Sequence, residues 1–218
     1  MIEQYKILYR GGSGELVEKK SRFIATTSPV TTEQAAAEFI AGIRKQYWDA
    51  RHHCFAYVIG AGAQLCRCGD DGEPSQTAGR PMLDVLLGQE LRDVCVVVTR
   101  YFGGTLLGTG GLVRAYSGAA QAGLRESQII EKKLARKLKI ITDYNGIGKV
   151  QYLLAGREIA VLDTQYTDQV EIVALIPGRE LAAVMAEITE GTSARAAMEP
   201  LETLYYGIAD KEIILFED

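Results

Sequence analysis

One run of apolar residues limits the possible folds of this chain more than any other feature. The segment DVCVVVTRYF, residues 93–102, is apolar along almost its whole length, which is typical of a strand in the middle of a sheet or covered on both faces. A helix is predicted soon afterwards, over about 110–126, with an inner apolar stripe that includes Leu112, Tyr116 and Leu124. Together the two segments predict an α+β fold with a helix packed on a buried sheet.

A glycine-rich stretch, GGTLLGTGG, connects the predicted strand to the predicted helix, and Arg100 and Arg114 flank it. It is not a P-loop, because Thr109 and Gly110 stand where lysine and serine or threonine are required. It is not a dinucleotide fingerprint either, because Val113 takes the place of the third glycine. The glycines in question are Gly103, Gly104, Gly108, Gly110 and Gly111.

Two interpretations of this stretch remain open. A loop before a helix N-terminus offers free N–H groups and the positive end of the helix dipole, so with Arg100 and Arg114 it can bind an anion. Alternatively, the glycines serve only a sharp turn and close packing of the helix on the sheet.

The remaining periodicity divides the chain into two regions. Before residue 134, strands are predicted at 5–9, 21–27, 52–60 and 63–69, a turn at 10–15, a helix at 32–47, and a second helix in which Met82, Val85 and Leu86 face a core. After a basic, strand-rich segment, the order is β-α-β-β-α-β, with strands at 137–143, 158–167, 169–177 and 194–206 and helices at 145–156 and 179–190. Asn145 is expected to cap the first of these helices. Two domains are therefore expected, 1–134 and 138–218, the second of them ferredoxin-like.

Charge and hydropathy exclude some classes of protein. The net charge is −4 and the pI is about 5.4, so a nucleic-acid site has to be a local patch rather than the whole surface. No segment is apolar for long enough to span a bilayer, and the first twenty residues lack a signal-peptide core. We expect a cytoplasmic protein with no membrane partner.

The four cysteines do not indicate a bound metal or a disulfide framework. Cys66 and Cys68 form a C-x-C pair. A zinc site needs two more ligands at a suitable spacing, and only His52, His53 and Cys54 are available as ligands. We expect no metal and no cofactor, with the thiols acting as ordinary small side chains.

Several long motifs carry a resemblance to a known family. The segments DDGEPSQTAGRPML and VVVTRYFGGTLLGTGGLVRAYSGAA, preceded by KKSRFIA and ARHHCFAYVIG, closely resemble the YigZ/IMPACT family, and the resemblance covers nearly the whole chain. One position departs from it: the family usually has a small residue, often glycine, after the serine of GEPS, and this chain has Gln76. The geometry of that loop is therefore in question.

The resemblance implies a fold and a broad role. It implies an N-terminal β-α domain similar to domain IV of elongation factor G, to ribonuclease PH and to a ribosomal protein. It also implies a C-terminal ferredoxin-like domain similar to domain V of elongation factor G. The eukaryotic relatives are translation regulators, and for bacterial members the resemblance suggests contact with nucleic acid or the ribosome.

The polar motif residues supply the candidate sites. They are His52, His53, Asp70, Asp71, Glu73, Ser75, Thr77, Arg80, Arg100 and Arg114. Strand alternation sends His52 and His53 to opposite faces, and we select His53, with Asp70, Asp71 and Glu73, as catalytic candidates. The acidic residues have either a turn-forming role, which we favour, or a role as oxygen ligands for Mg²⁺. Arg80, Arg100, Arg114 and the five glycines are the candidate anion or nucleic-acid site.

Two functions follow from these candidates. The first is a translation-associated regulatory factor that binds RNA or the ribosome through the Gly/Arg loop, or that binds protein partners of the translation machinery. The second is an enzyme acting on a small phosphorylated or nucleotide ligand. The basic run Lys132, Lys133, Arg136, Lys137 and Lys139 is expected to be a solvated face, or else a path for a phosphate backbone. Tyr101 and Phe102 are expected to be core residues, or else to stack on a base.

Overall fold

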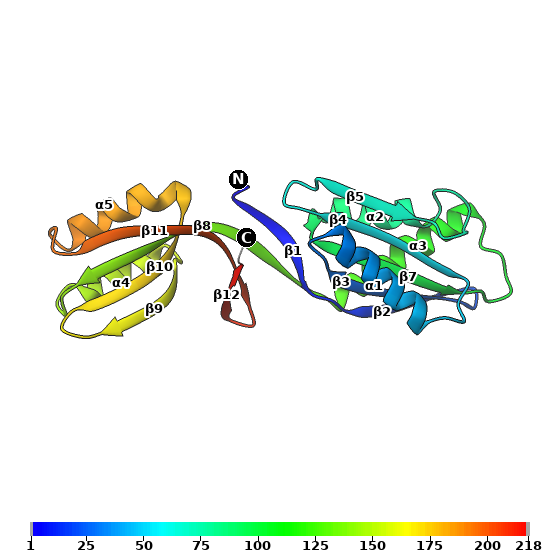
Figure 1. Cartoon of the computed structure of the whole chain (residues 1–218), viewed down its shortest axis with the longest axis horizontal. Helices are drawn as coiled ribbons and strands as arrows, with labels where there is room; N and C mark the ends of the chain where they lie inside the picture. Colours follow the sequence, from blue (N-terminus) through cyan, green and yellow to red (C-terminus); the bar gives the residue numbers. More distant parts are fainter. Residues whose placement is uncertain (1, 217–218) are drawn as a thin grey trace. The chain divides into compact units, whose positions relative to one another are not determined.

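The computed structural model describes residues 2–216, which divide into two compact units. The N-terminal unit comprises Gln4–Glu131 together with Ile2, and the C-terminal unit runs from Lys132 onward and includes Glu3. The structure is mixed α+β, with two sheets and five α-helices among the described residues (Figure 1). The division falls inside a continuous strand rather than in a loop. The folding domains at 1–134 and 138–218 stay a prediction.

The N-terminal unit is built on a five-stranded antiparallel sheet with the order β2-β3-β7-β4-β5. Its strands are β2 (Ser13–Glu18), β3 (Ser21–Pro29), β4 (His52–Ile59), β5 (Leu65–Gly69) and β7 (Val94–Tyr101). The apolar run singled out in the sequence is β7, the central strand, and its residues from Val94 to Arg100 are all buried. Two further strands, β1 (Gln4–Arg10) and β6 (Leu91–Arg92), pair in parallel outside this sheet.

Helices cover both faces of that sheet, which explains why β7 is apolar on both sides. Helix α1 (Glu33–Gln46) packs on one face, with Ile40 and Ile43 against Cys95 and Val97 (Figure 1). Helices α2 (Gly79–Gly88) and α3 (Thr109–Arg125) cover the other face.

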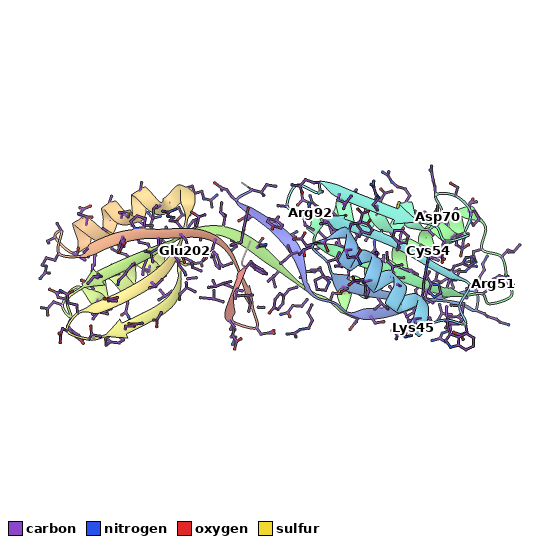
Figure 2. The ribbon with its side chains drawn as sticks, viewed as in Figure 1. Lys45, Arg51, Cys54, Asp70, Arg92 and Glu202 are labelled. Atoms are coloured by element: carbon purple, nitrogen blue, oxygen red, sulfur yellow. The ribbon has the colours of Figure 1, made fainter. Side chains whose placement is uncertain are left out.

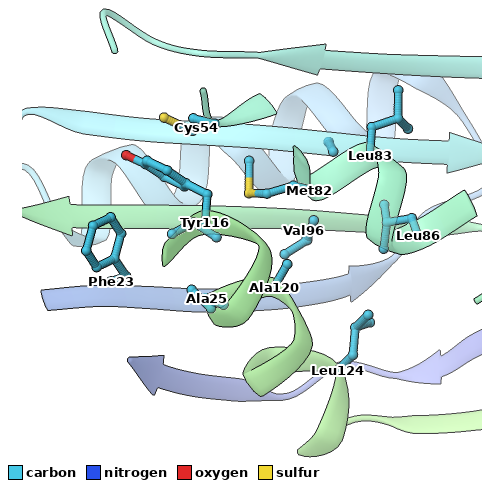
Figure 3. Close-up of a cluster of buried hydrophobic side chains, with 14 of the residues drawn as sticks. Phe23, Ala25, Cys54, Met82, Leu83, Leu86, Val96, Tyr116, Ala120 and Leu124 are labelled. Carbon is cyan, nitrogen blue, oxygen red and sulfur yellow. The ribbon is translucent and has the colours of Figure 1, made fainter. Parts of the chain in front are cut away.

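The core on the α2 and α3 side is the larger of the two. Figure 3 shows Tyr116, Ala120 and Leu124 along α3 and Met82 and Leu86 from α2, directed at the sheet. The Tyr116 ring meets the Phe23 ring edge to face, with centroids 5.1 Å apart, an arrangement that aromatic pairs prefer.

The C-terminal unit has the order β-α-β-β-α-β followed by one more strand. Its elements are β8 (Gln128–Thr142), α4 (Ile147–Gly156), β9 (Ala160–Tyr166), β10 (Val170–Pro177), a short 3-10 turn (Gly178–Glu180), α5 (Leu181–Gly191), β11 (Ala197–Ala209) and β12 (Glu212–Phe216). The antiparallel order is β9-β10-β8-β11-β12. Val150 and Leu154 of α4 and Val184 and Ile188 of α5 share one core against β8 and β10.

Two local predictions are wrong, the turn at 10–15 and the cap of α4, and one strand was not predicted. The turn expected at 10–15 contains the start of β2, where Gly14 lies so close to the Ala122 backbone of α3 that a side chain has no room. The basic, strand-rich segment 129–136 belongs to the 15-residue strand β8. Strand β12 was not predicted. Asn145 does not cap helix α4: its N-cap is Gly146, and the Gly146 N–H donates to Asp143 Oδ1 at 2.6 Å in the turn that precedes the helix.

None of the helices within residues 2–216 combines the length and the apolar character that crossing a bilayer requires.

Candidate functional site

A cavity of about 410 Å³ lies at the end of the N-terminal unit where β7 ends and α3 begins. We call it the α3 cavity, and its lining residues are Arg51, His52, Glu73, Pro74, Arg100, Phe102, Leu106, Leu107, Gly108, Thr109 and Leu112. Figure 2 shows Arg51 and Asp70 at this end of the unit and Arg92 at the opposite end. Apolar side chains line much of the cavity, and Arg51, His52, Glu73 and Arg100 provide its ionisable groups.

The glycine-rich stretch forms the loop between β7 and α3, and its glycines have different roles. A Cβ at Gly103 would overlap the backbone of Lys20 and Ser21, so this position has room only for glycine. The Gly103 N–H also donates to Ser21 Oγ at 3.1 Å. Gly104 and Gly108 instead have φ of +84° and +72°, in the left-handed region that favours glycine.

The first turn of α3 has no side-chain cap. Gly108 is its N-cap, and no side chain in the described part of the chain caps its N–H groups. Gly110 and Gly111 add no side chain that would cover these groups, and Arg114 lies beside them, with Nη1 3.6 Å from where a Cβ of Gly110 would be. This end of a 17-residue helix therefore presents N–H groups and the positive end of its dipole.

A buried ion pair forms the inner wall of the cavity. Arg100 Nη1 donates to Glu73 Oε1 at 2.6 Å, and the Tyr116 hydroxyl donates to the same oxygen at 2.8 Å. The Arg100 and Glu73 side chains are 7% and 4% exposed, so their charges compensate each other out of water. Arg100 Nε is also buried, and among residues 2–216 it has no hydrogen-bond partner. The Arg100 guanidinium lies 5.3 Å from the Phe23 ring centre and 5.6 Å from that of Phe102.

Burial raises the pKa of the Tyr116 hydroxyl well above its usual value, with the neighbouring Cys54 and Glu73 adding to the effect. Burial likewise raises the pKa of the Cys54 thiol. Figure 3 shows the Cys54 sulfur and the Tyr116 hydroxyl close to each other. Both groups are therefore neutral, hydrogen-bonding groups behind the wall of the cavity rather than nucleophiles.

The two histidines separate as strand alternation predicts, and His52, not His53, faces the cavity. His53 is buried, its Nε2 lies 3.1 Å from the Tyr47 carbonyl and its backbone N–H donates to Asp71 Oδ2 at 2.7 Å. His52 Nδ1 lies 2.9 Å from the Asp71 carbonyl oxygen. Since a carbonyl oxygen only accepts, Nδ1 of His52 carries a proton, and Nε2 of the neutral ring is an acceptor.

The two aspartates are engaged in holding the loop that follows β5. Asp70 Oδ1 accepts the N–H groups of Ala78 and Gly79 at 3.0 and 2.8 Å, and Asp70 Oδ2 accepts that of Gln76 at 2.8 Å. Asp70 therefore caps the start of α2 from outside the helix. Asp71 Oδ1 pairs with Arg44 Nη2 at 2.7 Å.

The loop around Gln76, whose geometry was in question from the sequence, has a strained backbone at this residue. Gln76 has φ +63°, a conformation that costs an ordinary L-residue about 1–2 kcal/mol and glycine nothing comparable. Of its neighbours in the motif, Ser75 is exposed, and Thr77 is buried with its hydroxyl donating to the Pro74 carbonyl at 2.6 Å.

The predicted anion residues only partly come together. Arg100 lines the α3 cavity and Arg114 lies beside the first turn of α3, while Arg80 is exposed on α2 and pairs with Asp84 at 2.8 Å. In the basic run, Lys137 pairs with Glu202, Lys139 pairs with Glu171, and Lys132 lies over the Tyr205 and Phe216 rings.

Arg51, Leu106 and Leu107 also line the cavity and were not among the residues that the sequence predicts for the site. Leu106 is 82% exposed, and its position between the glycines was the one sequence feature that could have indicated a place in the site. No group of three or more His, Cys, Asp or Glu side chains within the described chain is placed to hold a metal ion. Phe102 is 55% exposed, so it is not a core residue, whereas the Tyr101 hydroxyl donates to Asp49 Oδ1 at 2.8 Å.

Comparison with known proteins identifies both units. Residues 19–124 match the Impact N-terminal domain, and residues 140–195 match a domain of unknown function (DUF1949). The chain is 42% identical to the IMPACT family member YvyE of Bacillus subtilis over 94% of each chain. It is 36% identical to the IMPACT family member YigZ of Escherichia coli, over 83% of this chain and 91% of the other.

A solved crystal structure of a hypothetical protein superposes with a TM-score of 0.59 at 31% identity, covering 93% of this chain and 99% of that one. Protein IMPACT of Bos taurus matches only in part: it is 34% identical over 43% of this chain and 30% of its own length.

Proposed function

Because this chain belongs to the YigZ/IMPACT family, we propose that it is a regulatory factor of the translation machinery that binds RNA through the region around the start of α3. The family resemblance supports the link to translation. The C-terminal unit supports it further, since its β11-β8-β10-β9 order with two helices on one face is the arrangement expected of a ferredoxin-like domain, as in domain V of elongation factor G.

The observation that carries the proposal is the concentration of cationic groups at the start of α3. The exposed Arg51 and Arg114 lie beside a helix N-terminus without a side-chain cap in the described structure, and the buried Arg100 has an unpaired Nε. The chain as a whole has a net charge of −4, so this local accumulation of positive groups favours a phosphate ligand.

Arg51 and Arg114 are the informative residues for a binding test. Both are exposed, so alanine at either position is expected to leave the fold intact. A hydrogen bond from an arginine to a phosphate contributes enough that its loss weakens binding about tenfold. The dependence of log K on log salt is expected to become shallower by about one for each phosphate contact removed.

Fluorescence anisotropy with a labelled ribosomal RNA fragment, at two salt concentrations, measures these effects, and co-sedimentation with ribosomes measures them for the assembled partner. Arg125→Ala is the matched control, because Arg125 is exposed at the opposite end of the same helix. Equal binding by wild type, Arg51→Ala, Arg114→Ala and the control would refute the proposed surface. The absence of binding to RNA and ribosomes at low salt would refute the proposed function.

One observation favours a second candidate, an enzyme acting on a small phosphorylated or nucleotide ligand. His52, with Nε2 as its acceptor in the neutral ring, lines the same cavity as the exposed Arg51, so a base and a cation suited to phosphate are brought together. Phosphorus NMR of nucleotides incubated with the protein would reveal turnover. Turnover that survives His52→Ala would exclude this histidine as the base.

A further inference from the structure

We infer that the α3 cavity binds one unstacked nucleotide of a single strand, with the base against Phe102 and Leu107 and the phosphate at the first turn of α3. The inference rests on the proposed function and specifies its ligand as a nucleoside monophosphate unit. That unit can be free or part of single-stranded RNA, and the two sources can be told apart by experiment.

The size and composition of the cavity carry the first step. At about 410 Å³ it lies in the lower part of the range of small-molecule sites, about 300–1,000 Å³, which suits one nucleotide rather than several. Its lining has two chemically distinct parts, the apolar Phe102, Leu106 and Leu107 and the polar group of Arg51 and Thr109. A nucleotide has the same division between a flat base and an anionic phosphate.

The second argument for a nucleotide ligand is the position of Phe102. Its ring is 55% exposed, which is unusual for phenylalanine, and the Arg100 guanidinium lies 5.6 Å from the ring centre. The guanidinium is held by Glu73, so it fixes Phe102 from one side while the ring remains accessible to solvent. An aromatic ring placed in this way is what proteins use to stack a base of a single strand.

The third argument for a nucleotide ligand is that polar groups at the cavity have unused hydrogen-bonding capacity. Arg100 Nε is buried and lacks a partner in the described chain, which is costly unless a ligand or water supplies one. His52 Nε2 is an acceptor in the neutral ring and can receive a sugar hydroxyl or a base amine. The N–H groups at the first turn of α3 complete the set as donors to the phosphate.

The geometry excludes double-stranded RNA from the cavity. Bases of a duplex are stacked and paired, so they reach a protein ring only when they are splayed out, as in loops, bulges and single-stranded ends. The cavity interaction is therefore expected only with single strands, whereas attraction by Arg114 is expected with both forms.

The test measures anisotropy of a labelled ten-nucleotide RNA, alone and annealed to its complement, with adenosine monophosphate, uridine monophosphate and inorganic phosphate as competitors. For the full-length wild type we expect single-stranded RNA to bind at least tenfold more tightly than the duplex. Phe102→Ala should weaken single-strand binding roughly 5- to 150-fold, the range found for loss of one stacked base, and leave duplex binding unchanged. Tyr152→Ala is the control, because Tyr152 is also an exposed aromatic beside a cation, Lys149, but lies in the C-terminal unit.

The outcomes separate the two proposals. Equal binding of single strand and duplex, both unaffected by Phe102→Ala, overturns the nucleotide cavity and leaves the RNA-binding function standing. Binding of the monophosphates, sensitive to Phe102→Ala, without binding of any RNA supports the cavity for a free nucleotide and overturns the RNA-binding function. Competition by inorganic phosphate as strong as by the monophosphates overturns the base contact. A melting temperature of Phe102→Ala equal to that of wild type verifies that the variant is folded.

Discussion

Arg100 and Glu73 form an ion pair, 2.6 Å from Nη1 to Oε1, in which both side chains are more than nine-tenths buried. The pair joins the central strand β7 to the loop that precedes α2, so it holds the inner wall of the α3 cavity together. For the same reason the first role of Arg100 is to stabilise the fold. A binding test on an Arg100 variant therefore also measures a change in stability.

Arg100→Ala is expected to destabilise the protein by about 3–5 kcal/mol, because it leaves the buried Glu73 carboxylate without its cation. Glu73→Gln keeps an acceptor for Arg100 and Tyr116 and should cost clearly less. Urea unfolding followed by circular dichroism gives both values. An Arg100→Ala variant as stable as wild type would show that Glu73 finds another partner or is protonated.

Stability is expected to fall as the pH rises above about 9. Burial raises the pKa values of Cys54 and Tyr116 in the folded protein above their ordinary values of 9.0 and 10.0. The unfolded chain therefore releases these protons first, which favours unfolding, whereas below pH 9 both groups are protonated in both states.

Tyr116→Phe measures how much of this loss of stability at high pH comes from the tyrosine. It removes one hydrogen bond to the Glu73 carboxylate, which costs about 1.5–3 kcal/mol at pH 7, but it should make the loss of stability between pH 10 and 11 less steep. Urea unfolding of wild type and Tyr116→Phe at pH 7, 9, 10 and 11 measures both slopes. Identical slopes would mean that Tyr116 ionises equally in both states.

Gly103→Ala should destabilise the protein more than Gly104→Ala, although the two residues are neighbours. At Gly103 a Cβ would overlap the backbone of Lys20 and Ser21, so β7 and the β2–β3 turn must separate. At Gly104 there is open space among the described residues, and alanine meets only the strain of a φ of +84°, about 1–2 kcal/mol. Thermal melting should therefore show the larger loss for Gly103→Ala, and the reverse order would contradict the packing described here.

The thiols should differ in reactivity by position. Burial raises the pKa of Cys95 to about 12 and raises that of Cys54 as well, so neither forms thiolate at pH 8. Cys68 is exposed and is expected to react with Ellman's reagent in the folded protein. Cys68→Ser should remove the fastest phase, and guanidinium should release the buried thiols. Rapid reaction of Cys95 without denaturant would indicate local opening of the sheet.

The sequence predicted the parts of the fold that depend on local periodicity. The apolar run became the buried strand β7, and the helix expected at about 110–126 is α3, Thr109–Arg125. Strand β2 was missed because Gly11, Gly12 and Gly14 at its start resemble a turn, while Gly14 is in fact required by the approach of α3, a contact between distant segments. Residues 129–136 were recognised as strand-rich, but their pairing with β11, more than sixty residues later, is not revealed by the local sequence.

The site was harder to predict for the same reason. Strand alternation separates His52 from His53 but does not tell which face carries α3, so the sequence did not reveal that His52 rather than His53 lines the α3 cavity. The pairing of Arg100 with Glu73 spans 27 residues and two elements, and Arg51 is recognisable only once the loop 102–108 is seen beside the start of β4. The anion site of Arg80, Arg100, Arg114 and the glycines stays a prediction.

Asp70, which caps α2, bears on how many phosphates this end of the protein can hold. Helices α2 and α3 pack on the same face of the sheet, and each begins with N–H groups that attract negative charge. At α2 the Asp70 carboxylate acts as an intramolecular competitor, present at an effective concentration that a free anion does not reach in solution. The expected stoichiometry is therefore one anion per N-terminal unit, at α3.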